Sequence, residues 1–158
     1  MKKATLVVLA LVMALTLVMG SVSMVSAAAP VRQAFGGGLL ANNRLPIGIS
    51  FQARQLDADT GAAAGNFTWS ISSQGNKILG KVLYLSVSDD GNNAWIGFVV
   101  THLVSETVNT EDFIGSEWVM EVQDDTNQIS SPQPGPASDA TLHEPMHLFN
   151  LKGQVTVR

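Results

Sequence analysis

The stretch from Gly65 to Val104 alternates apolar and polar side chains with the two-residue period of a β-strand. Phe67 and Trp69 share one face of the first predicted strand, and the next two strands are apolar on both faces. Strands apolar on both faces lie in the middle of a packed sheet. Gly75-Asn76 and the run Asp89 to Asn93 supply turn residues between them. The stretch therefore predicts three consecutive antiparallel strands.

Alternation recurs on both sides of this meander. It predicts an edge strand that carries Gly36-Gly37-Gly38 and ends at Leu40, and further strands from Ile47 to Ala53, Ile114 to Val122 and Phe149 to Val157. No segment has a convincing helical period. About seven strands without helices predict an all-β chain, folded as a single antiparallel β-sandwich or a small β-barrel. Pairing of the last strand with the first is one way to close it.

The first 28 residues have the three parts of a secretory signal peptide. Met1-Lys2-Lys3 is positive, Ala4 to Met19 is an unbroken run of apolar and small residues, and a small-residue segment follows. We predict cleavage at Ala28 and one β domain over 29–158, secreted or held in the cell envelope after export by the general secretory route. An uncleaved anchor is disfavoured, because the run is shorter than the roughly 20 residues of a spanning helix.

Composition limits the partners. The nine Lys and Arg residues, less Lys2 and Lys3 of the leader, leave seven against 13 Asp and Glu, a net charge of −6. An acidic surface without basic clusters argues against nucleic acid and anionic membranes. The chain has no cysteine, so it has neither disulfides nor a lipid-attachment site for a stable membrane anchor after cleavage. A cell-envelope or carbohydrate partner stays open, and no cofactor is indicated.

The segment 143–147, His-Glu-Pro-Met-His, has the letters of the H-E-x-x-H zinc-peptidase motif. That motif needs a helix to put both histidines on one face, and Pro145 is incompatible with one there. The motif lies in the least regular segment, 124–147, which has four prolines and is expected to be a long loop, either functional or disordered. The weak candidate metal ligands in this loop are His143, His147, Asp124 and Asp125.

Two Asp-rich runs, Asp57 to Gly61 and Asp89 to Asn93, have the oxygen-rich look of calcium loops but lack the ligand spacing and the closing glutamate. Turn chemistry explains both. His102 alternates with Phe98 and Val100 and is expected to be a packed or rim residue. The three tryptophans line either a core or a carbohydrate or lipid site: Trp69, Trp95 and Trp118.

Several short motifs follow one another in a recognisable order: Gly36-Gly37-Gly38, Gly65 to Trp69, Leu85-Ser86-Val87, Asn93 to Gly97 and Gly153 to Arg158. This layout resembles that of a family of small secreted bacterial all-β proteins of unknown function. Members of that family often carry cysteines near the L-x-V strand and before the last strand, and this chain has none. The resemblance implies an exported β domain and no activity.

No nucleophile, acid pair or metal cluster stands out from the sequence. The sequence therefore favours a secreted, non-enzymatic binding or structural β module. The alternative is a metal-dependent extracellular hydrolase that uses the loop histidines.

The leader gives the first prediction. Protein recovered from culture medium or cell wall is expected to begin at Ala28 or Ala29, because a signal peptidase cuts after small residues. Mass spectrometry of the intact protein measures this directly. Recovery of the full leader in a membrane fraction would contradict it.

Overall fold

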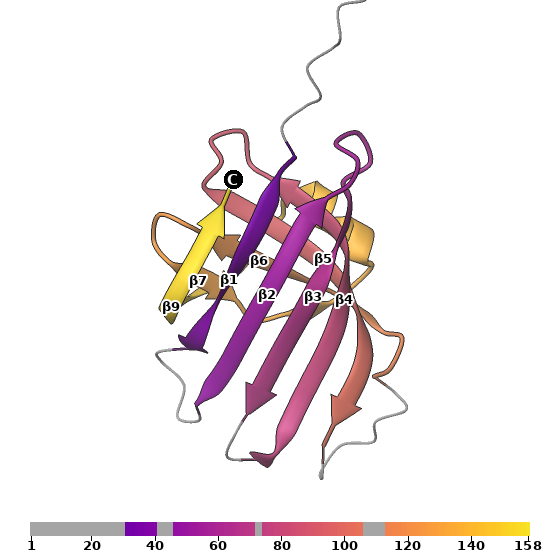
Figure 1. The fold of residues 1–158 in the computed structure, drawn as a ribbon, viewed down its shortest axis with the longest axis vertical. Coiled ribbons are helices and arrows are strands. Elements are labelled where there is room, and N and C mark those ends of the chain that lie inside the picture. Colours follow the sequence, from indigo (N-terminus) through magenta and orange to yellow (C-terminus); the bar gives the residue numbers. More distant parts are fainter. Residues whose placement is uncertain (1–30, 41–45, 72–73, 106–112) are drawn as a thin grey trace, which may run out of the picture.

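The computed structural model describes residues 31–40, 46–71, 74–105 and 113–158 (Figure 1). These residues form nine strands and one 3-10 helix. In chain order they are β1 (Gln33–Leu40), β2 (Ile47–Gln55), β3 (Ala62–Ile71), β4 (Asn76–Val87), β5 (Asn93–Val104), β6 (Glu117–Gln123), β7 (Gln128–Ser130), β8 (Gln133–Pro134), η2 (Ala137–Leu142) and β9 (Leu148–Val157).

The strands close into an antiparallel barrel. The order β1-β2-β3-β4-β5-β6-β7-β9 returns to β1, and β8 pairs with the start of β6 as an extra strand. The all-β prediction is confirmed, and of its two architectures the barrel is the one observed. The pairing of the last strand with the first is also found, with Ala34 opposite Val157.

The count of about seven strands was too low. The segment 124–147, expected to be a loop, contains β7, β8 and η2. Strands of two and three residues are too short to show a two-residue period, so they left no pattern in the sequence. The predicted strand from Ile114 also begins later, at Glu117, because 113–115 form a turn.

The barrel interior is one continuous apolar core. On β2 the buried residues Ile49, Phe51 and Ala53 alternate with exposed neighbours, as predicted. The core draws on all strands except β8, and Phe67 and Phe98 stack at its centre with ring centroids 4.0 Å apart. Burial of these side chains stabilises the chain without disulfides.

Two β-bulges in the pairing of β4 with β5 change which side chains face inward. In the β4–β5 ladder the register shifts at Leu83 and again at Thr101, each of which has no opposite residue. A bulge residue reverses the alternation beyond it. His102, which simple alternation puts on the face of Val100, is therefore exposed on the outside, and Leu103 turns inward and is buried.

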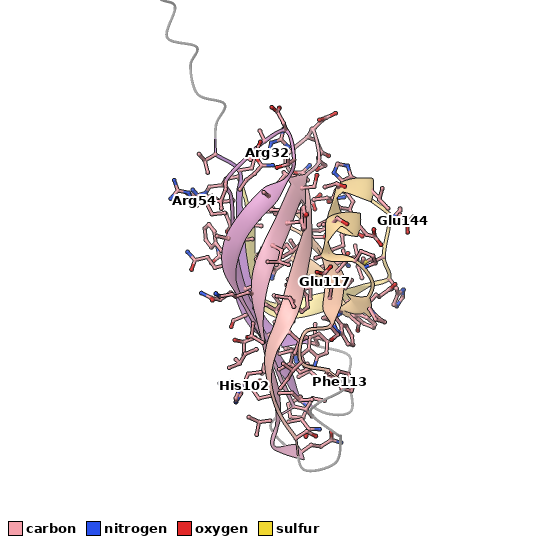
Figure 2. All side chains as sticks on the ribbon, turned by 90° about the vertical axis from the view of Figure 1, so that its right-hand side faces the viewer. Arg32, Arg54, His102, Phe113, Glu117 and Glu144 are labelled. Atoms are coloured by element: carbon pink, nitrogen blue, oxygen red, sulfur yellow. The ribbon has the colours of Figure 1, made fainter. Side chains whose placement is uncertain are left out.

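The outer wall of the barrel is covered on one side by η2, which explains why β5 is apolar on both faces. Trp95, Val119 and Ala140 form a second, smaller core between wall and helix. The backbone of η2 lies directly on β5, since a Cβ added at Gly97 would come within 1.9 Å of the Ala137 carbonyl oxygen. Figure 2 shows Glu144 on this covered side.

The contact between β1 and β9 is closer than side chains permit. A Cβ at Gly153 would lie 2.0 Å from the Gly37 carbonyl oxygen, and one at Gly38 would lie 2.5 Å from that of Lys152. Both values are far below van der Waals contact. The run Gly36-Gly37-Gly38 thus marks the closing seam of the barrel.

On its other side, the partner of β9 among the described strands is β7, which has three residues, and side chains complete the pairing. Asn127 Nδ2 donates to the carbonyl oxygens of Leu151 (3.1 Å) and Gly153 (2.7 Å), and Asn127 Oδ1 accepts from the Val155 amide (2.7 Å). Asp124 Oδ2 accepts from the Val157 amide at 3.0 Å. These two side chains bind backbone groups of β9 that a longer neighbouring strand would otherwise pair, and so leave them with partners.

Asn127 therefore makes a testable contribution to stability. Asn127→Gly keeps the positive φ of 53° and removes three hydrogen bonds, so the free energy of unfolding is expected to fall by roughly 2–4 kcal/mol. Urea denaturation measures the change. The control Gln128→Ala removes one exposed hydrogen bond to Asn150. Its free energy of unfolding should fall by less than about 1 kcal/mol. Equal midpoints for the two variants would refute this role.

Candidate functional site

The motif at 143–147 is not helical, as Pro145 predicted. His143 ends η2 with a φ of 55° and shares a hydrogen bond with the Ser86 hydroxyl through Nε2. Its ring stacks on Trp95 with centroids 4.4 Å apart, and Trp95 Nε1 donates to the Glu144 carbonyl at 3.0 Å. These contacts fasten the end of η2 to the barrel wall.

The pair of Ser86 and His143 also has the form of a nucleophile beside a base. In the part of the chain that the structure describes, no carboxylate hydrogen-bonds the second ring nitrogen of His143. The pair is exposed at the surface beside η2, and neither residue is among the described residues that line the cavity beside Trp69. Its geometry serves the attachment of η2.

The other candidate ligands have separate partners. His147 is exposed, and its ring meets the Phe149 ring edge-on with ring centroids 4.8 Å apart. Asp124 accepts a hydrogen bond from the Val157 amide, and Asp125 is exposed in the turn after β6. Over the described ranges, no three His, Asp or Glu side chains group as a metal site would require. The structure does not bring the four candidates together.

The Asp-rich runs are turns whose carboxylates bind their own backbone. Asp57 Oδ1 accepts from the amide of Asp59 at 2.9 Å, and this bond lowers the pKa of Asp57. The pKa of Asp90 is lowered by the Ser88 hydroxyl and then by the Asn92 amide, 3.1 Å from Oδ1. The turn interpretation accounts for these oxygens.

A more promising site lies inside the barrel, toward the lower end of Figure 1, where β3 ends and β4 begins. A cavity of about 230 Å³ opens there. Its floor is formed by the buried side chains of Phe67, Phe98 and Val100, and the half-buried Trp69 and Trp118 stand at its sides. The described residues that line it are Phe67, Trp69, Ile78, Phe98, Val100, Trp118, Ser131 and Pro132.

Strand register explains this lining. Inward positions on β3 and β4 pair across the ladder, with Trp69 opposite Ile78. Gly80 lies opposite Phe67, and the Phe98 ring packs closely against it, since a Cβ there would lie 2.8 Å from Phe98 Cδ2. Trp118 Nε1 donates to Ser116 Oγ at 2.8 Å, which satisfies its polar group away from the cavity. None of the described lining side chains is ionisable.

A second cavity of about 110 Å³ adjoins the first and shares Trp69 and Ile78 with it. It lies closer to the rim, and its further lining residues are Ile71, Asn76, Leu103, Ser105 and Phe113. Figure 2 shows Phe113 at this end of the barrel. Its ring stacks on that of Trp118, with ring centroids 6.1 Å apart. Because they share Trp69 and Ile78, the two cavities form one site lined mainly by apolar side chains.

Sequence reasoning found part of this site. It offered the tryptophans as core or as the lining of a binding site, and Trp69 and Trp118 line the cavity whereas Trp95 is core. Phe67, Ile78, Phe98 and Val100 come from the three consecutive strands β3, β4 and β5, which the alternation predicted. Ser131 and Pro132 lie in the segment that had no readable pattern.

Comparison of the chain with protein-family models, curated proteins and solved structures finds no match. Within the described ranges, no helix combines the length and apolar character needed to cross a membrane.

The Asp90 turn gives a prediction for pH dependence. A carboxyl whose folded pKa lies below its unfolded value adds stability above the unfolded pKa, and that stability is lost as pH falls through the folded value. Asp90→Asn keeps a turn-forming side chain without the titration, so its urea midpoint should fall less than wild type between about pH 5 and pH 3.

The matched control is Asp89→Asn, an exposed neighbour whose side chain makes no hydrogen bond to the turn within the described residues, and this variant should follow the wild-type pH profile. A steeper acid loss in Asp90→Asn than in wild type would show that the sign is wrong.

Proposed function

We propose that this chain is an exported, non-enzymatic binding module that holds a small apolar molecule in the cavity beside Trp69 and Trp118. The observation that carries the proposal is the cavity itself, about 230 Å³ with almost wholly apolar walls. Eight-stranded barrels have interiors just wide enough for side chains or for one small ligand. Export follows from the predicted leader at 1–28 and agrees with the resemblance to small secreted proteins.

The lining distinguishes between the ligand classes that the sequence left open. A carbohydrate needs many hydrogen-bonding partners, and among the described residues that line the larger cavity Ser131 alone has a hydroxyl, amide or charged side chain. Two half-buried indole rings instead suit an apolar body, because aromatic side chains offer large apolar area in a fixed shape. The proposal therefore favours an apolar ligand over a sugar.

Size narrows the ligand further. An apolar cavity of about 150 Å³ accepts benzene, so the larger volume here suits a molecule of about eight to ten heavy atoms. With such a ligand, a dissociation constant on the order of 0.1–1 mM is expected.

The test is a titration with 1-octanol, followed by tryptophan fluorescence. A saturable change is expected because Trp69 and Trp118 line the cavity. Ile78→Trp fills the space between them and should abolish binding. Trp95→Phe alters the tryptophan outside the cavity and should leave binding unchanged. Binding by Ile78→Trp equal to that of wild type would place the ligand elsewhere and refute the proposal.

A further inference from the structure

One polar atom at the rim of the cavity lacks a partner. Asn76 lines the smaller cavity, and its Oδ1 is buried with no hydrogen bond to any described residue. Its Nδ2 donates to Gln74 Oε1 at 3.2 Å, so only the acceptor is left over. A buried polar atom without a partner is costly, and such an atom in a native fold calls for an explanation.

The position of Asn76 relates this atom to the apolar cavity. Asn76 lies opposite Ile71, two residues before Ile78, which is shared by both cavities. Two residues of a strand span about 7 Å, so a ligand seated beside Ile78 can extend to Asn76. The terminal torsion of asparagine is broad, and a small rotation turns Oδ1 toward such a ligand.

The charge of the lining adds a second constraint. Neither cavity has a Lys, Arg, His, Asp or Glu side chain among its described lining residues, and Lys77 next to Asn76 is exposed. A carboxylate buried there would lose its hydration without gaining a cation. The site therefore disfavours fatty acids and other anions.

We infer that the natural ligand is a neutral apolar molecule with one hydrogen-bond donor, a hydroxyl group, which Asn76 Oδ1 accepts while the apolar body lies against Trp69 and Trp118. This inference rests on the proposed function and adds the ligand's chemical class. The hydroxyl supplies the donor that the buried oxygen lacks.

The experiment compares three molecules of eight carbon atoms by the same fluorescence titration. They are 1-octanol, octanoate, and heptyl methyl ether, an isomer of 1-octanol that has no hydrogen-bond donor. Wild type is expected to bind 1-octanol about five- to tenfold more tightly than the ether, the usual worth of one hydrogen bond. Octanoate should bind at least about tenfold more weakly than 1-octanol.

Two variants test the role of Asn76. Asn76→Leu should bind 1-octanol and the ether with nearly equal affinity, because the acceptor is gone. The matched control Asn66→Leu makes the same substitution on the exposed outer face of β3 and should keep the wild-type preference. Thermal denaturation confirms that both variants are folded before they are titrated.

The outcomes separate the two proposals. If 1-octanol and the ether bind wild type equally, or if octanoate binds most tightly, the donor inference is overturned and the binding function stands. If Asn76→Leu keeps the preference for 1-octanol, the inference is likewise overturned. If none of the three probes binds, both proposals fall.

Discussion

The structure depends on the close contact between β1 and β9. With no disulfide available, the barrel closes only because Gly38 and Gly153 let two backbones approach to distances that any side chain would prevent. Closure removes sheet edges, which would otherwise expose unpaired backbone groups to other chains. It also encloses the interior, so the apolar cavity and its tryptophans exist as a site only in the closed barrel.

Backbone pairing in the barrel is incomplete at the short strand β7, and polar side chains supply the hydrogen bonds that the backbone of β7 does not. Asn127 and Asp124 satisfy four backbone groups of β9 that a longer strand would have paired. Asp124, a candidate metal ligand from its sequence, is thus used for structure. The same holds for His143, whose ring and Nε2 fasten η2 to the wall.

Much of the fold could be predicted from alternation, and the failures have physical causes. The strands around Phe51 and Phe67 follow the two-residue period because one face lies in the core. Beyond the bulge at Thr101 the period reverses, so the side chain of His102 was assigned to the wrong face. A single sequence does not reveal a bulge whose residue is as ordinary in a strand as threonine.

The site was harder to predict because it consists of an unfilled volume and an unpaired polar atom as well as of the side chains that line it. Neither the unfilled volume nor the unpaired Oδ1 of Asn76 leaves a local pattern in the sequence.

A cavity among well-packed residues has a physical cost that favours the binding interpretation. Interiors normally pack as densely as organic crystals, and an apolar void lowers stability by about 24 cal/mol for each Å³. For the volume beside Trp69 this gives on the order of 5 kcal/mol as an upper bound, because the cavity opens at the rim. One larger side chain in place of Ile78 or Val100 would recover much of that. A purely structural barrel gains nothing from leaving the space empty, whereas a bound molecule fills it and stabilises the folded state by mass action.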